Sequence, residues 1–350
     1  MAGLTARLCT ALTVTALSVA SCSSGAADTS AGAGNGKSGT GAASSSGPVK
    51  GPLTIAMINK QGTQQYFVDE ANGAQEAAKA LGDVTIKVTD VQLDSNAAVN
   101  AVNTAIAQKV NGIIITTPDP KIGPAIIKLA QQANIPLIAT NDAIKDSSGK
   151  EAAYVGFSGT EMGQAVGGKA GELYKASGWT PANTAILDVT KPDLPTCAER
   201  AAGSLSAFKK VVGAEVPKVI NVYTDAGTPQ ALDRTGAAVT ANRGVKNWVV
   251  WGCNDESETG AVTALQNAGF GAGKVIGVGL GAYLTCKDWK AGGKTGNKAA
   301  LSLKGDDVGK VAVNLLVDSL KNGKPVPAIS KVPTKIVDAT NWQQSGVVCT

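Results

Sequence analysis

The chain has 350 residues, of which 43% are hydrophobic, 17% charged and 4% aromatic, and its formal net charge is +5. This length allows two domains with separate cores, and the composition is that of a soluble globular protein. The positive charges form no dense block of Lys and Arg, which argues against a nucleic-acid partner.

The N-terminus has the pattern of an export signal. Arg7 precedes a short apolar run, residues 8–20, which is too short to span a bilayer and fits the hydrophobic region of a signal peptide. The run ends in Val19-Ala20-Ser21-Cys22, and small residues before a cysteine resemble the lipobox of bacterial lipoproteins. We expect residues 1–21 to be a signal peptide and Cys22 to carry a lipid. The alternative is an ordinary secretory signal with an incidental cysteine.

The residues after Cys22 predict a tether. Residues 23–50 are almost entirely Ser, Gly, Ala and Thr, a composition that cannot bury apolar surface. We therefore expect residues 22–50 to be a flexible link between a lipid and a folded region. Lipid and tether together predict an extracytoplasmic protein anchored to the outer face of the cell membrane.

From residue 53 onward, strand-like and helix-like patterns alternate. The first series predicts strands at 53–58, 84–88, 113–116, 136–140 and 154–156, and helices at 68–81, 97–109 and 122–133. The second series predicts strands at 184–189, 218–222, 248–251, 275–278 and 334–337, and helices at 197–212, 228–242, 256–268 and 307–320. Two such series predict an α/β fold with two Rossmann-like lobes, each a parallel sheet flanked by helices.

Polar and aromatic side chains follow the predicted strands, where open α/β sheets bind their ligands. A mixture of donors and acceptors suits a ligand covered in hydroxyl groups, and flat aromatic rings suit the C–H face of a sugar. The polar candidates are Lys60, Gln64, Asn141, Asp142, Arg200 and Asn254, and the aromatic ones are Tyr66 and Phe67. Each has a plainer interpretation, such as a helix N-cap for Asn254 or a surface cation for Arg200. Their clustering at strand ends favours ligand contact.

Other motifs give weaker signals. The chain has no histidine, which excludes Ser-His-Asp and Cys-His catalytic arrangements and a histidine metal site. We interpret the pairs Asp69-Glu70 and Asp306-Asp307 as first-turn residues that complement helix dipoles. The run 277–281 lacks the spacing of a dinucleotide-binding motif and predicts a tight turn after a strand. We therefore expect a protein that is not an enzyme and that uses no cofactor or metal.

Four cysteines remain beyond the predicted lipid site: Cys197, Cys253, Cys286 and Cys349. An even number in an exported chain favours disulfides, and zinc is disfavoured because neither a C-x-x-C pair nor a histidine is present. Three pairings are possible. We favour Cys286–Cys349, which would hold the C-terminus, but the sequence leaves the pairing open.

Several short motifs, in the same order, carry a resemblance that covers nearly everything from Leu53 to about Asn341. They are Lys60-Gln61 followed by Tyr66-Phe67, the stretch 116–123, Gly178-Trp179, Arg200 before Gly203, and Asn254-Asp255. At these positions the chain resembles the periplasmic sugar-binding proteins of ABC importers, and among them the L-arabinose binders. The resemblance implies the type I periplasmic binding fold with three hinge crossings, near Phe157, Leu303 and Thr334. It implies an N-terminal lobe of 51–157 plus 304–334 and a C-terminal lobe of 158–303 plus 335–350.

The resemblance also implies roles for individual residues. The matches to Lys60, Asp142, Arg200 and Asn254 contact the sugar, Tyr66 or Phe67 stacks on it, and Thr196 helps to position the arginine. There are four departures from the arabinose binders. Gln64 stands at an acidic position, Asn141 replaces the first of two adjacent aspartates, Phe157 replaces a methionine in the cleft, and Gly281 replaces an asparagine that bonds the sugar.

The function that this resemblance implies is sugar capture. We expect a monomeric binding lipoprotein that delivers a monosaccharide, L-arabinose or a related pentose, to an ABC permease in the membrane. The alternative is a binder of another monosaccharide or a polyol that presents its ligand to a chemoreceptor or histidine kinase.

Overall fold

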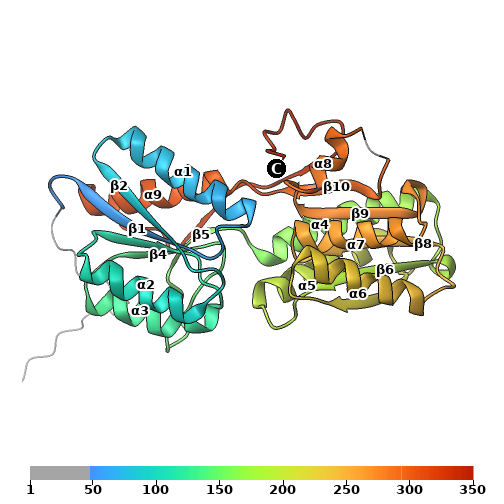
Figure 1. Cartoon of the computed structure of the whole chain (residues 1–350), viewed down its shortest axis with the longest axis horizontal. Coiled ribbons are helices and arrows are strands. Elements are labelled where there is room, and N and C mark those ends of the chain that lie inside the picture. Colours follow the sequence, from blue (N-terminus) through green and yellow to red (C-terminus); the bar gives the residue numbers. More distant parts are fainter. Residues whose placement is uncertain (1–47, 293, 350) are drawn as a thin grey trace, which may run out of the picture. The chain divides into compact units, whose positions relative to one another are not determined.

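The computed structural model describes residues 48–292 and 294–349. The expected signal peptide, the lipidation site at Cys22 and most of the expected tether lie outside the described residues. In the described part of the chain, no helix is both long enough and apolar enough for a membrane span. Strands and helices alternate in two series, each built around its own sheet (Figure 1).

The first lobe contains a six-stranded sheet. Its strands are β1 (Leu53–Asn59), β2 (Val84–Asp90), β3 (Gly112–Ile115), β4 (Leu137–Thr140), β5 (Ala153–Gly156) and β11 (Ile329–Lys331). They lie in the order β2-β1-β3-β4-β5-β11, and every neighbouring pair is parallel. Its helices are α1 (Gln65–Leu81), α2 (Ser95–Ala107), α3 (Gly123–Gln132) and α9 (Gly305–Asn322), with a 3-10 turn at Pro120–Ile122.

Both faces of this sheet are buried, because successive residues of a strand face opposite sides. Ile55 and Met57 of β1 pack in the same apolar cluster as residues of α1 and α9. Ala56 and Ile58, which alternate with them, pack in a second cluster with residues of α2 and α3. Figure 1 shows these helix pairs on opposite faces of the sheet. This two-sided burial explains the continuous apolar runs from which the strands were predicted.

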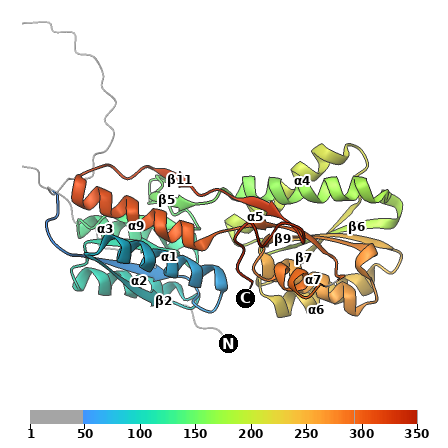
Figure 2. The ribbon, with the colours of Figure 1, turned by 90° about the horizontal axis from the view of Figure 1, so that it is seen from above.

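The second lobe repeats the arrangement. Its strands are β6 (Thr184–Thr190), β7 (Lys218–Tyr223), β8 (Asn247–Gly252), β9 (Val275–Gly281), β10 (Asn297–Ser302) and β12 (Lys335–Val337). They lie in the order β7-β6-β8-β9-β10-β12, all parallel except β12, which runs antiparallel to β10. Its helices are α4 (Gly159–Ser177), α5 (Pro195–Val212), α6 (Thr228–Ala241), α7 (Asp255–Asn267) and α8 (Thr285–Lys290), with 3-10 turns at Pro181–Asn183 and Ala272–Lys274. In Figure 2, α4 and α5 lie on one face of the sheet and α6 and α7 on the other.

The chain passes between the two sheets three times: between β5 and α4, between β10 and α9, and between β11 and β12. The expected fold class, two Rossmann-like lobes with mostly parallel sheets and three crossings, is confirmed. The lobe boundaries, 51–157 plus 304–334 and 158–303 plus 335–350, remain a proposal, which the sheet membership of β11 and β12 supports.

Helix α4 was not predicted, because its five glycines give it a low intrinsic helix propensity. Two of them allow it to touch α5 directly. A Cβ atom at Gly163 would overlap the carbonyl oxygen of Arg200, and one at Gly167 would overlap the carbonyl oxygen of Ser204. Close packing against α5 therefore stabilises a helix that local propensity does not favour. Strands β10 and β11 and the short helix α8 were also missed.

Two interpretations of motifs were wrong. Helix α1 begins at Gln65, so Asp69-Glu70 is not in its first turn, and Glu70 is buried beside the hydroxyl of Thr116, 3.5 Å away. Gly277 and Gly279 lie inside β9 rather than in a turn. These positions are glycines because side chains of Glu258 and Asp255 pack where a Cβ would stand. Asp306-Asp307 does occupy the first turn of α9, as predicted.

The four cysteines form two disulfides, Cys197–Cys253 and Cys286–Cys349. The second is the pairing favoured from the sequence. It ties α8 to the C-terminal segment, where Trp289, Val337 and Trp342 form a small apolar cluster around it.

Candidate ligand-binding cleft

A cavity of about 640 Å³ is lined by residues of both lobes. In each sheet the strand order reverses beside the first strand, β1 lying between β2 and β3, and β6 between β7 and β8. Ligands of open α/β sheets bind at such reversals, beyond the carboxyl ends of the strands. The wall of this cavity is built from those segments. It brings together nine of the eleven predicted residues: Lys60, Gln64, Tyr66, Phe67, Asn141, Asp142, Thr196, Arg200 and Asn254.

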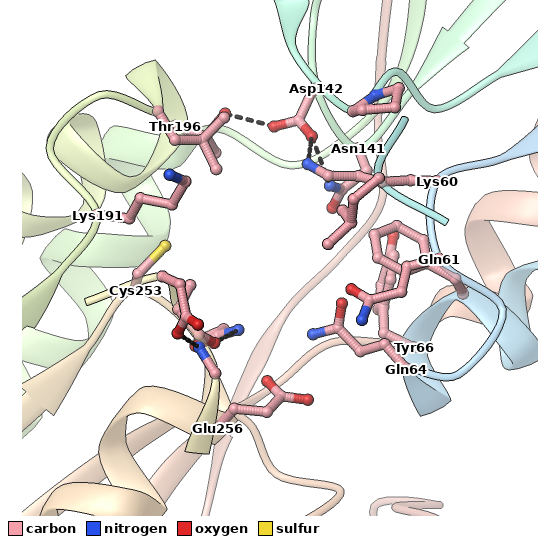
Figure 3. Close-up of a pocket in the computed structure, with 18 of the residues that line it drawn as sticks. Lys60, Gln61, Gln64, Tyr66, Asn141, Asp142, Lys191, Thr196, Cys253 and Glu256 are labelled. Atoms are coloured by element: carbon pink, nitrogen blue, oxygen red, sulfur yellow. Dashed lines mark hydrogen bonds and ion pairs between the residues drawn. The ribbon is translucent and has the colours of Figure 1, made fainter. Parts of the chain in front are cut away.

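Asp142, just beyond β4, is the centre of the largest polar cluster (Figure 3). The ammonium of Lys60, beyond β1, donates to Asp142 Oδ2 over 2.8 Å, and the Asn141 amide donates to the same oxygen over 3.1 Å. From the other lobe, the Thr196 hydroxyl donates to Asp142 Oδ1. Burial acts to raise the pKa of Asp142, but the Lys60 ammonium, the Thr196 hydroxyl and the Arg200 cation outweigh it and hold the pKa below its ordinary value. Asp142 is therefore a buried, ionised acceptor.

Arg200 lies on α5 and is buried, with 8% of its surface exposed. One guanidinium nitrogen, Nη1, donates to the carbonyl oxygen of Cys253 over 2.7 Å. Its Nε is buried and has no hydrogen-bond partner among the residues that the structure describes. Thr196, expected to position this arginine, is instead bonded to Asp142. Arg200 thus brings a desolvated cation with unused donors to the cavity.

Tyr66 and Phe67, in the first turn of α1, bring two aromatic rings to the cavity wall. Their rings are perpendicular, with centroids 5.1 Å apart. Phe157 packs behind them, with its ring centroid 6.3 Å from that of Tyr66. Phe157 is not among the described residues that line the cavity, and its expected contact with a ligand stays a prediction.

Asn254 combines two roles. It is the N-cap of α7, where its Oδ1 accepts from the backbone N–H of Ser257 over 3.0 Å, as the plainer interpretation predicted. Its amide nitrogen donates to the carbonyl oxygen of Ala226 over 2.9 Å. One amide proton is left for a ligand in the cavity that Asn254 lines.

Gly281 does not line the cavity, and the reason is Tyr283. Gly281 has a φ of 145°, and a Cβ atom there would overlap the Tyr283 ring. The glycine therefore leaves room for Tyr283, whose hydroxyl donates to the Glu256 carboxylate over 2.8 Å and accepts from the Gln64 amide over 3.1 Å. Figure 3 shows Glu256 and Gln64 facing each other from opposite lobes.

Glu256 was not predicted as a site residue. It was taken as the first residue of the predicted helix 256–268, although it comes only two residues after Asn254 at a strand end. Tyr283 follows β9 and lies in the segment 279–283 after a predicted strand, where ligand contacts were expected, but it was not chosen as a site residue. The cavity wall also includes the charged residues Lys191, Asp193 and Asp225. Lys191 and Asp193 lie in the segment after the predicted strand 184–189, but only Thr196 and Arg200 were chosen from it.

The chemistry of the cavity is that of hydrogen bonding. Anionic acceptors (Asp142, Glu256) and cationic donors (Lys60, Arg200) alternate with amides around it. No group of three Cys, Asp or Glu in residues 48–292 and 294–349 is arranged to hold a metal ion. A wall that combines charged donors and acceptors with amides and aromatic rings fits a polyhydroxylated molecule.

The fold and this cleft define the chain as a periplasmic binding protein. Residues 55–325 match the family described as periplasmic binding protein domain, and the chain belongs to that family. It is 29% identical over 301 residues to an ABC transporter L-arabinose-binding periplasmic protein of Azospirillum brasilense, covering 83% of this chain and 88% of the relative. It is 31% identical over 235 residues to the L-arabinose-binding periplasmic protein of Escherichia coli strain K12, covering 65% and 70%.

Solved structures agree on the fold. A periplasmic solute-binding protein from Actinobacillus succinogenes with bound D-allose superposes with a TM-score of 0.71 at 25% identity, covering 83% of this chain and 99% of that one. A myo-inositol-binding protein from Caulobacter gives a TM-score of 0.71 at 21% identity, covering 86% and 98%, and shows likeness of fold only. The resemblance to sugar-binding proteins of ABC importers is confirmed.

Proposed function

We propose that this protein binds a monosaccharide between its lobes and delivers it to an ABC transporter. The observation that carries the proposal is the cluster at Asp142, where a buried carboxylate accepts hydrogen bonds from both lobes beside the buried cation of Arg200. A hydroxyl group can donate to the carboxylate and accept from the guanidinium at once. Two relatives that are named as L-arabinose-binding proteins, from Azospirillum brasilense and Escherichia coli, support the same class of ligand.

L-Arabinose or a related pentose is the leading ligand. The polar set of Lys60, Asp142, Arg200 and Asn254 would pair with ligand hydroxyls, and Tyr66 or Phe67 would cover a sugar face. Leaving one of these buried groups unpaired costs about 1–3 kcal/mol, so that a wrong epimer would be rejected. Where the arabinose binders have an asparagine that bonds the sugar, this chain has Gly281, and the Tyr283 ring packs against it. This difference would change one end of the cavity, so the alternative ligand is another monosaccharide or a polyol.

We further propose a binding cycle without chemistry. The lobes close on the sugar, the three crossings absorb the rotation, and the ligand is released unchanged to the permease. Two hydrogen bonds that already join the lobes, Thr196 to Asp142 and Gln64 to Tyr283, are the contacts that would hold the closed form. A lipid on Cys22 would keep the protein at the outer face of the membrane. We propose that the protein acts there as a monomer. Incorporation of labelled palmitate, lost in Cys22→Ser, tests that anchor.

A thermal-shift screen across pentoses, hexoses and polyols tests the proposed function. A ligand that binds only the folded state at a hundredfold excess over Kd adds about 2.7 kcal/mol of stability, which raises Tm by several degrees. We expect L-arabinose or a close relative to give the largest shift and its mirror-image sugar to give none. If no sugar or polyol in the panel raises Tm, the proposed function is wrong.

Glu256 makes a separate prediction about pH. Burial, with help from the nearby Asp255 carboxylate, raises the pKa of Glu256 to about 7. If its ionised form accepts a ligand hydroxyl, the affinity should fall about tenfold from pH 8 to pH 6, because protonation then competes with binding. Calorimetry at both pH values measures this fall, and Glu256→Gln should bind more weakly at pH 8 and lose the dependence.

Glu256→Gln should gain stability at pH 8, although it loses affinity for the ligand at that pH. The folded protein binds the proton of Glu256 more tightly than the unfolded chain, so this group's contribution to stability declines as pH rises from about 4.5 to about 7. Glu256→Gln should therefore raise Tm at pH 8 while lowering affinity there. If the pH dependence of binding persists in Glu256→Gln, another carboxyl group causes it. Glu70 is such a group, because burial raises its pKa to about 7 as well.

A further inference from the structure

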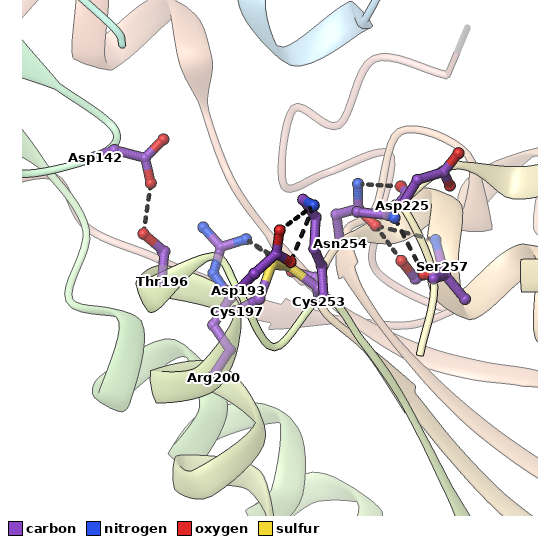
Figure 4. Close-up of a disulfide and its surroundings, with 12 residues drawn as sticks. Asp142, Asp193, Thr196, Cys197, Arg200, Asp225, Cys253, Asn254 and Ser257 are labelled. Atoms are coloured by element: carbon purple, nitrogen blue, oxygen red, sulfur yellow. Dashed lines mark hydrogen bonds and ion pairs between the residues drawn. A yellow bond between two sulfur atoms is a disulfide. The ribbon is translucent and has the colours of Figure 1, made fainter. Parts of the chain in front are cut away.

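One residue, Cys253, connects α5 to the end of β8 at two points. Cys197 and Arg200 are three residues apart on α5 and so face the same side of the helix. The sulfur of Cys197 is bonded to that of Cys253, with Cα atoms 4.9 Å apart. Arg200 Nη1 donates to the carbonyl oxygen of the same Cys253 over 2.7 Å. Figure 4 shows Arg200 rising from α5 beside the disulfide.

This double connection belongs to the cleft. Cys253 lines the cavity and directly precedes Asn254, the N-cap of α7. Both sulfur-bearing residues are almost fully buried, with 0% and 4% of their surface exposed. The Arg200 guanidinium donates to the carbonyl oxygen of Cys253. Its Nε has no hydrogen-bond partner in the described part of the chain. The position of Cys253 therefore decides where the guanidinium is held.

We propose that the Cys197–Cys253 disulfide is a positioning element of the ligand site, which acts through Arg200; the inference rests on the proposed sugar-binding function. By fixing the first turn of α5 to the end of β8, the disulfide keeps the Arg200 donor and its carbonyl acceptor in register before the ligand arrives. A guanidinium on a long side chain loses much rotational freedom when it is ordered, and prior ordering spares the ligand that cost.

The second disulfide provides a matched control. Cys197–Cys253 and Cys286–Cys349 span 56 and 63 residues, so loop closure predicts similar effects on the unfolded chain. Cys286 and Cys349 are not among the residues that line the cavity. A disulfide that acts only on stability should therefore behave like the control, whereas a positioning disulfide should differ from it in affinity.

The experiment is calorimetric titration of two double variants with the sugar that gives the largest thermal shift. We expect Cys197→Ala/Cys253→Ala to raise Kd at least about tenfold, and Cys286→Ala/Cys349→Ala to leave it within about twofold. The third measurement is a double-mutant cycle. In an Arg200→Ala background, removal of the Cys197–Cys253 disulfide should change Kd by less than about threefold, because its effect passes through the arginine.

The outcomes separate the two proposals. Wild-type protein that binds no sugar overturns the proposed function itself. Wild-type binding with an unchanged Kd in Cys197→Ala/Cys253→Ala overturns only the positioning role, as does an undiminished effect in the Arg200→Ala background. If that variant does not fold, the control variant is reduced chemically, its free thiols are counted, and its fold is checked by circular dichroism. An unchanged Kd for the folded, reduced protein would then contradict the inference, and a tenfold rise would support it.

Discussion

Arg200→Ala is expected to weaken sugar binding by about 30-fold to several thousandfold, which corresponds to the 2–5 kcal/mol that truncation of a buried, hydrogen-bonded charge costs. The side chain is 8% exposed, and the variant would remove the cation beside Asp142 and leave the Cys253 carbonyl without its donor. Arg200→Lys should recover only part of the affinity, since a lysine keeps the charge but not the planar set of donors. Calorimetric titration of both variants measures the loss.

Arg243→Ala is the matched control for this prediction. Arg243 is exposed, just beyond α6, and is not among the residues that line the cavity. Its replacement should leave Kd unchanged. If Arg200→Ala binds as tightly as Arg243→Ala, the cavity around Arg200 is not the ligand site.

Gly167→Ala is expected to destabilise the protein by about 3 kcal/mol, because the added methyl group would overlap the carbonyl oxygen of Ser204. The backbones of α4 and α5 meet there, and both helices also contact strands of the sheet. Unfolding in urea, followed by circular dichroism, measures the loss.

Gly168→Ala provides the control on the next residue of the same helix. A Cβ at Gly168 meets open space, so the variant should be more stable than wild type by about 0.5–1 kcal/mol, the gain from replacing an interior helical glycine. Two adjacent substitutions of the same kind are thus expected to act in opposite directions. Equal effects at Gly167 and Gly168 would contradict the packing of α4 on α5.

These two glycines also show where sequence-based prediction stops. Strands such as β1 and β3 were predicted because two-sided burial makes most of their residues apolar, which is a local pattern. Helix α4 is interrupted by five glycines, and Gly163 and Gly167 are explained by carbonyl groups of α5, a separate element. Elements stabilised by contacts that are distant in sequence could not be found from local periodicity.

The residues of the site likewise fall into those that were predicted from the sequence and those that were not. Lys60, Asp142 and Arg200 were predicted because each follows a strand or resembles a family position, and the structure brings them together in one cavity. Glu256 and Tyr283 were not chosen, although both follow strands, and the place of Tyr283 in the cleft depends on the room that Gly281 leaves for its ring. Phe157 was placed in the cavity wall, but it packs behind Tyr66.

The most direct test of sugar capture between the lobes is a crystal structure of the protein with the sugar that gives the largest thermal shift. The proposed function predicts one unmodified sugar in the cavity, with hydroxyl groups within hydrogen-bonding distance of Asp142 and Arg200 and a ring face against Tyr66 or Phe67. A sugar bound outside this cavity, or bound inside it without contact to either Asp142 or Arg200, would contradict it.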